Sequence, residues 1–319
     1  MASIGYHASH EQFSPGELLQ CAQLASRAGF GSVMCSDHFH PWSRQQGHSG
    51  FAWSWLGAAM NGSDCTFGVV TSPVGRYHPA VIAQACATLA QMFPRRFWVA
   101  VGSGEALNES ITGQPWPGKP VRNARLREAV QVMRRLWAGE TVDHDGHFKL
   151  RHATLYTRPE TAPNVLLAAL SADTARWGAA WADGLITVGT PEAPVQEIIE
   201  AFREGGGEGK PIHLQIKLSY DVDEEAALQG AFEQWRNNAV SRTQTEELGT
   251  PEQFERCAAG VTPEDVAKVV HVSADPARHR QWLRQYLDLG ATHLHLHNVN
   301  RAQSRFIETF GRDVLPALQ

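Results

Sequence analysis

The sequence lacks clustered basic residues, long apolar runs and paired cysteines. Its 28 Lys and Arg are outnumbered by 33 Asp and Glu, for a net charge of −5. No stretch gathers the cations that bind the phosphates of nucleic acid or an anionic membrane. Apolar runs stay well short of the ~18 residues of a transmembrane helix. We therefore expect neither nucleic acid nor membrane among the partners.

The five cysteines are odd in number and widely spaced, and most have apolar neighbours: Cys21, Cys35, Cys65, Cys86 and Cys257. This pattern is typical of unpaired thiols in a reducing compartment. Residues 1–5 do not show the charged segment and apolar stretch of a signal peptide. Both features predict a cytoplasmic protein.

Eight short apolar runs, near residues 4, 32, 66, 97, 165, 185, 213 and 293, alternate with helical patterns. Helices are expected at 15–28, 51–60, 80–92, 123–138, 173–181, 194–203, 224–238, 276–289 and 302–315. This alternation predicts an α/β fold, a (β/α)8 TIM barrel, with the strand at 165–170 among its members. No shift in composition marks a second domain, so residues 1–319 are expected to form one.

Insertions are expected at the C-terminal face of the strands, and a small hairpin on the barrel rim. Residues 142–156 alternate in polarity and contain Asp145-Gly146, which predicts a hairpin. Residues 243–265 are polar, with a weak pattern, and are read as a long excursion that borders the substrate pocket.

Candidate catalytic residues follow two of the strands. In a TIM barrel the carboxyl ends of the strands carry the chemistry. Asp37, His38 and Trp42 lie in the segment SDHFHPW, where Asp37 is suited to orient the imidazole and Trp42 offers a flat face to a planar ligand. The glycines of Gly102-Ser103-Gly104-Glu105 let backbone approach a ligand closely. We expect His38 and Glu105 to act across the barrel as an acid–base pair.

The histidines offer an alternative. His38 and His40 alternate, as do His293, His295 and His297, and alternate residues of a strand share one face, a spacing suited to metal ligands. A metal-dependent barrel hydrolase would also need ligands on the intervening strands, and none occurs there. The other interpretation of these histidines is polar filling of the barrel core.

Two lysines complete the candidates. Lys217 lies within the predicted strand 213–220, where a buried amine is expected to need a carboxylate partner. Lys268 is expected either to hold an anionic group of the substrate or to be a solvated surface residue.

Together these segments resemble the luciferase-like flavin and deazaflavin oxidoreductases, and within them the coenzyme F420-dependent glucose-6-phosphate dehydrogenase branch. The resemblance runs from about residue 4 to 317. It rests on GYHAS with EQF (5–13), SDHFHPW (36–42), GH (47–48), SW (54–55), RY with PAVIAQA (76–85), GSGEALNE (102–109), ADG (182–184) and IKLSY (216–220).

The resemblance implies roles for particular residues. His38 would do acid–base work at the reactive face of the cofactor, with Trp42 beside it and Glu105 as partner acid. Cofactor contacts would come from Asp37, Ser103, Gly104, Asn108 and the turn Val70-Thr71, where the family carries a non-proline cis peptide. The family's phosphate-binding glycine pair corresponds here to Leu170-Ser171. Substrate contacts would come from Glu11, Thr190 and Lys268.

The function expected is hydride transfer between F420 or FMN and a small organic substrate. The family's sugar-phosphate lysine near Thr190 is absent, so glucose 6-phosphate is not the predicted substrate. The alternatives are an FMN-dependent monooxygenase and a flavin-binding protein without catalysis. The resemblance also implies a homodimer.

Overall fold

Eight parallel strands close into a barrel in the computed structural model, which describes residues 2–318. They are β1 (Ser3–Ala8), β2 (Ser32–Ser36), β3 (Thr66–Thr71), β4 (Phe97–Val101), β7 (Asn164–Ala168), β8 (Gly184–Gly189), β9 (Ile212–Ser219) and β11 (His293–Asn298). Each pairs in parallel with its neighbour, and the pairings of β8 with β9 and β1 with β11 close the ring. The predicted TIM barrel is confirmed, with all eight strands at their expected positions.

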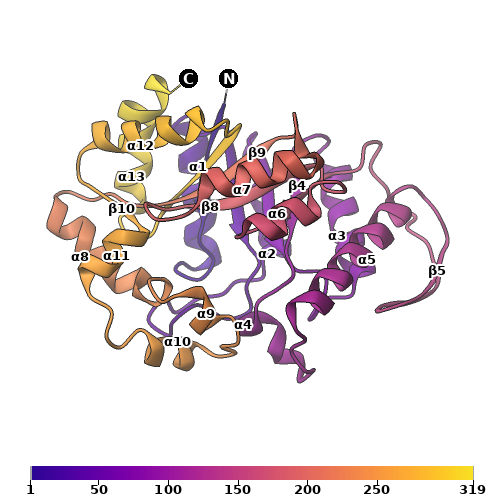
Figure 1. The fold of residues 1–319 in the computed structure, drawn as a ribbon. Helices are drawn as coiled ribbons and strands as arrows, with labels where there is room; N and C mark the ends of the chain where they lie inside the picture. Colours follow the sequence, from indigo (N-terminus) through magenta and orange to yellow (C-terminus); the bar gives the residue numbers. More distant parts are fainter. Residues whose placement is uncertain (1, 319) are drawn as a thin grey trace.

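Helices surround the barrel (Figure 1). They are α1 (Pro15–Arg27), α2 (Ala52–Asn61), α3 (Pro79–Met92), α5 (Lys119–Trp137), α6 (Ala172–Gly178), α7 (Val195–Phe202), α8 (Glu224–Trp235), α12 (Pro276–Asp288) and α13 (Gln303–Thr309). Local chemistry sets their ends: Ser14 and Glu17 form a reciprocal capping box at the start of α1, with Pro15 in its first turn. None of the helices within residues 2–318 combines the length and apolarity needed to cross a bilayer.

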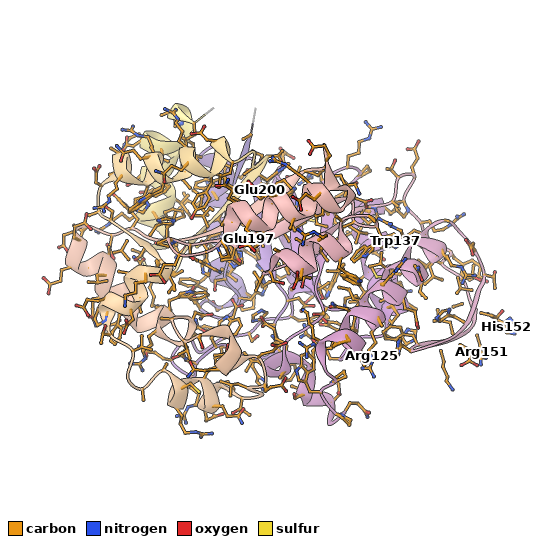
Figure 2. The ribbon with its side chains drawn as sticks, viewed as in Figure 1. Arg125, Trp137, Arg151, His152, Glu197 and Glu200 are labelled. Carbon is orange, nitrogen blue, oxygen red and sulfur yellow. The ribbon has the colours of Figure 1, made fainter. Side chains whose placement is uncertain are left out.

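The predicted hairpin is also confirmed. β5 (Val142–Asp145) and β6 (Lys149–Ala153) pair antiparallel as a separate two-stranded sheet. Figure 2 shows Arg151 and His152 on this hairpin at the edge of the molecule, and both side chains are largely exposed. These two side chains therefore take no part in the candidate site.

The excursion after α8 is more ordered than the sequence pattern suggested. It contains α9 (Arg242–Thr245), α10 (Pro251–Cys257) and α11 (Pro263–Val269), followed by β10 (His271–Val272), which pairs with β9. Thr250 with Gln253 and Thr262 with Asp265 form capping boxes, each followed by a proline in the first turn. These start signals, rather than apolar periodicity, define the short helices.

Two predicted boundaries were wrong near candidate residues. β7 ends at Ala168, so Leu170 lies beyond the strand, and the next helix begins at Ala172 with Ser171 as its cap. α5 begins at Lys119, four residues before the predicted start, because Pro120 is well placed in a first helical turn. Lys119 is thereby fixed beside the end of β4.

Candidate active site

A buried ion pair joins the ends of β1 and β2. Glu11 is 2% exposed, and its Oε1 lies 3.0 Å from Nδ1 of His38. Ser9 donates its hydroxyl hydrogen to the other oxygen of Glu11, at 2.9 Å. The structure thus gives His38 a carboxylate partner, Glu11, which the sequence reading had assigned to the substrate.

The pair shifts both groups toward their charged forms. Burial opposes ionisation of Glu11, but the imidazole of His38 outweighs it and holds the pKa of this carboxyl below its ordinary value. Burial likewise favours the neutral form of His38, but the charge of Glu11 and, more weakly, that of Glu105 raise the pKa of the imidazole. His38 is therefore a stronger base than a free imidazole.

Trp42 lies against the imidazole, as the sequence suggested. The two rings meet edge to face with their centroids 5.2 Å apart. The indole also packs against Phe254 of α10, and Asn237 donates its amide hydrogen to the carbonyl of Trp42 at 2.9 Å. The excursion after α8 is thus in direct contact with this part of the site.

Asp37 is the centre of a second buried network. Its carboxylate accepts hydrogen bonds from Trp53 at 3.1 Å, Thr71 at 2.8 Å and Tyr77 at 3.3 Å, and it pairs with Arg76 at 3.1 Å. Arg76 also pairs with Glu109, at 3.3 Å. The backbone of Asp37 is engaged as well: the N–H donates to the carbonyl of Val70 at 2.9 Å, and the carbonyl accepts from Arg76. Asp37 therefore holds neighbouring elements in place and has no unsatisfied donor for a cofactor.

The turn after β4 is tightly packed at Gly104. Gly104 has φ +81°, and a Cβ there would lie 2.9 Å from Oγ of Ser72 and 3.2 Å from the ring of Trp116, so neighbouring side chains already fill the space beside it. Oγ of Ser72 and Nε1 of Trp116 are buried and have no hydrogen-bond partner among residues 2–318. These two unsatisfied polar atoms near the ends of β3 and β4 fit a polar cofactor seated there.

Neighbouring residues support that turn. Oδ1 of Asn108 accepts from the backbone N–H groups of Phe39, at 2.8 Å, and His40, at 3.3 Å, so only its amide hydrogens are left for a ligand. Lys119 donates to Oγ of Ser103 at 2.9 Å. Glu105 precedes α4 (Ala106–Glu109) and is partly exposed. Its charge acts on His38 through space, without a direct contact.

Comparison with known proteins identifies the family. Residues 2–293 match the model of the luciferase-like monooxygenase family. The chain belongs to this family. It is 40% identical to the F420-dependent glucose-6-phosphate dehydrogenase of Intrasporangium calvum and 37% identical to that of Beutenbergia cavernae. These alignments span 100% of this chain and 99% and 98% of the two relatives, respectively.

Solved structures agree. An F420-dependent secondary alcohol dehydrogenase in complex with an F420–acetone adduct superposes with a TM-score of 0.91 at 31% identity, covering 100% of this chain and 99% of that one. An F420-dependent tetrahydromethanopterin reductase from Methanopyrus kandleri, at 18% identity and TM-score 0.81, shares the fold. The resemblance inferred from the motifs is confirmed, and this luciferase-like chain is an oxidoreductase.

The ends of β7 and β8 look different from those of β1 to β4. Leu170 is 41% exposed, and Ser171 caps α6 through Thr174. The carbonyl of Thr190 accepts a hydrogen bond from Tyr286 at 3.1 Å. Lys268 is more than half exposed and pairs at 2.7 Å with Asp265 of its own helix. None of the four makes a hydrogen bond or ion pair with Glu11 or His38.

Two other expectations were wrong. The peptide bonds of residues 2–318 are all trans, including the bond between Val70 and Thr71, which keep the extended backbone of β3. Lys217 has a histidine partner instead of a carboxylate: its Nζ lies 3.0 Å from Nδ1 of His297 and 4.6 Å from the ring centre of Trp235.

Of the histidines proposed as metal ligands, His293 and His295 belong to the barrel core, with His213. His213 stacks on His293 with centroids 3.9 Å apart and lies 3.1 Å from His295, and both His213 and His295 contact Trp98. No group of three or more His, Cys, Asp or Glu in the part of the chain that is described is arranged to hold a metal ion. Polar filling of the core is the interpretation that these contacts support.

Sequence reasoning missed Arg76, Glu109 and Lys119 as members of this region. Arg76 follows β3, and Asp37 and Glu109 follow β2 and β4, the strands on either side of it. A pair of acids around one buried Arg could have been suspected from that order. Lys119 had no signal, because its approach to Ser103 depends on where α5 begins.

Proposed function

We propose that this chain is an F420-dependent dehydrogenase that oxidises a small, uncharged alcohol. The observation that carries the proposal is the buried Glu11–His38 pair, 3.0 Å apart, at the strand ends of a barrel whose similar proteins are named as F420-dependent dehydrogenases. An imidazole with a raised pKa is suited to take a hydroxyl proton.

The bound cofactor would supply the redox chemistry by accepting the hydride of the carbinol carbon. The residues suited to hold it are those around the turn after β4: Ser72, Ser103, Gly104, Asn108 and Trp116. Thr71 and Val70 form the adjacent end of β3, and Leu170 and Ser171 would border the tail of the cofactor.

His38 moves the proton in this scheme. Its Nδ1 lies 3.0 Å from Glu11. We assign the hydrogen of the neutral imidazole to this nitrogen, nearest the carboxylate, which leaves Nε2 to accept the hydroxyl proton of the substrate. Glu11 stays ionised and stabilises the imidazolium that forms. Glu105 adds a second negative charge, and Trp42 limits where the substrate can lie.

The lack of an available cation near the site, among the described residues, favours an uncharged substrate. The turn after β8 runs Gly189-Thr190-Pro191-Glu192 and offers no cation. The nearby Lys268 is paired with Asp265, and Arg76 is shared by Asp37 and Glu109. A dianionic sugar phosphate would lack the charge-assisted contacts that such a group needs, which are worth roughly 1.5–3 kcal/mol each.

The test is reduction of F420 by the purified protein, followed by loss of cofactor fluorescence, with propan-2-ol, glucose and glucose 6-phosphate as donors. We expect turnover with an uncharged alcohol and little with glucose 6-phosphate. FMN binding in preference to F420, or oxygen uptake with reduced FMN, would instead support the monooxygenase alternative. Binding of F420 without turnover on a broad set of alcohols would contradict the proposal.

A further inference from the structure

Lys217 is a buried amine with an unusual set of neighbours. It lies near the end of β9, is 8% exposed and forms no ion pair with a carboxylate of residues 2–318. Its Nζ sits between Nδ1 of His297, at 3.0 Å, and the face of Trp235, at 4.6 Å. Burying an ammonium group without a carboxylate is costly, so a lysine at this place calls for a reason beyond packing.

The hydrogen-bond directions around Lys217 can be worked out. Gln12 donates from its Nε2 to the carbonyl of Val299 at 2.6 Å, which fixes its Oε1 as an acceptor. Nε2 of His297, 3.0 Å from that oxygen, therefore carries a hydrogen. Burial lowers the pKa of His297, so its ring is neutral and its Nδ1 is bare. Lys217 is then the donor to His297.

This chain leads back to the catalytic pair. From Lys217 it passes through His297 to Gln12, the residue next to Glu11. The ring of His7 lies 4.3 Å from that of His297 and packs beside the same chain. A change at Lys217 would therefore reach the loop that holds Glu11.

Charge couples the two places as well. Burial lowers the pKa of Lys217 to about 7, while the negative charges of Glu11 and Glu105 oppose that shift. Four titratable groups act on Lys217 or contact it, from β1 and its loop, the end of β4, and β11: His7, Glu11, Glu105 and His297. From α8 it faces only the uncharged Trp235.

We propose that Lys217 is a positioning residue for the reaction: its ammonium group, held by His297 and Trp235, balances the negative charges of Glu11 and Glu105 and so tunes how strongly His38 binds a proton. The inference rests on the proposed function for its catalytic meaning, but the electrostatic coupling stands without it. A positive charge near the Glu11–His38 pair disfavours a second positive charge on the imidazole. Loss of the ammonium should raise the pKa of His38.

The test is an NMR titration of the His38 ring in the full-length protein without cofactor. Lys217→Met keeps the apolar stem against Trp235 and removes the charge, so the titration midpoint of His38 should rise by roughly half a unit to one unit. Lys217→Arg is charged throughout the titration, so it should leave the midpoint at or somewhat below its wild-type value. Lys149→Met, which changes a lysine that is 75% exposed on the hairpin, is the matched control. An unmoved midpoint in Lys217→Met would overturn the inference.

A second measurement needs no variant. Reductive methylation with a ¹³C label reports the titration of each lysine in the wild-type protein. Lys217 should titrate well below the ordinary 10.5. A midpoint at that ordinary value would also overturn the inference, because the amine would then not be the buried group described above.

The two proposals fail in different ways. If the chain is not an F420-dependent dehydrogenase, turnover is absent while the midpoint of His38 still moves in Lys217→Met. If only the role of Lys217 is wrong, turnover is present and the acidic limb of kcat/KM is the same in Lys217→Met as in the wild type.

Discussion

The ends of β1 to β4 and the ends of β7 and β8 belong to one barrel, yet they are built differently. In the first region charged side chains are buried and tied to one another across strands, as in Glu11 with His38 and Asp37 with Arg76. In the second, Leu170 is exposed and Ser171 and Lys268 are satisfied within their own helices. Buried contacts between strands fix the positions of the charged side chains in the first region. In the described part of the chain, the side chains of the second region have no such contacts between strands.

The largest loss of activity is expected from a change at His38, in the first of these two regions. His38→Ala removes the base, so kcat with F420 and an alcohol should fall by about 100-fold to 10,000-fold. Binding of F420, measured by fluorescence, should change little, because the polar groups of Ser72 and Trp116 near the turn after β4 are untouched. A loss of kcat of less than about tenfold would show that another group moves the proton.

A large loss of stability is expected at Arg76. Arg76→Met leaves the buried carboxylates of Asp37 and Glu109 without their cation, which should lower the free energy of unfolding by roughly 3–5 kcal/mol. Denaturant unfolding measures it. Arg44→Met is the matched control, since Arg44 pairs with Glu255 on the surface and its loss should barely move the unfolding midpoint. Equal shifts in both variants would remove the contrast between buried and exposed pairs.

The Glu11–His38 pair should stabilise the fold in a defined pH window. The pKa of Glu11 lies below its ordinary 4.5, so its contribution is present above that pH and is lost as the pH falls through the pKa of the folded state. The pKa of His38 lies above its ordinary 6.5, so its contribution is present below that pH and is lost as the pH rises through the folded pKa.

The difference in unfolding free energy between wild type and Glu11→Gln should therefore be largest between pH 4.5 and 6.5. It should shrink as the pH rises through the pKa of His38 in the folded state. Denaturant unfolding at a series of pH values gives the curve. A difference that grows steadily into the alkaline range would mean that the pair does not ionise as described.

The smallest effect is expected at the ends of β7 and β8. Lys268→Ala removes an exposed side chain paired with Asp265, so KM for the alcohol should change by no more than about twofold. Steady-state kinetics measures it. A tenfold rise in KM would restore Lys268 as the substrate-binding residue that the sequence suggested and would weaken the contrast between the regions.

The same contrast explains what sequence reasoning could predict. The barrel followed from apolar runs of the right length, and His38, Trp42 and Gly104 stood in motifs that follow strands. The partner of His38 could not be derived, because Glu11 and Glu105 follow different strands, β1 and β4. Only packing decides which carboxylate reaches the ring. Lys217 was misjudged for a similar reason: His297, 80 positions away in sequence, takes the place of the expected carboxylate.

The measurement that tests the central claim most directly is the pH dependence of kcat/KM for F420 reduction in the wild type and in Glu11→Gln. Glu11 raises the pKa of His38 above 6.5 against the effect of burial. The midpoint of the acidic limb in the wild-type profile should therefore lie above pH 6.5. In Glu11→Gln, where burial acts without the carboxylate, this midpoint should move below that value. The same acidic limb in both proteins would contradict the assignment of the Glu11–His38 pair as the group that moves the proton.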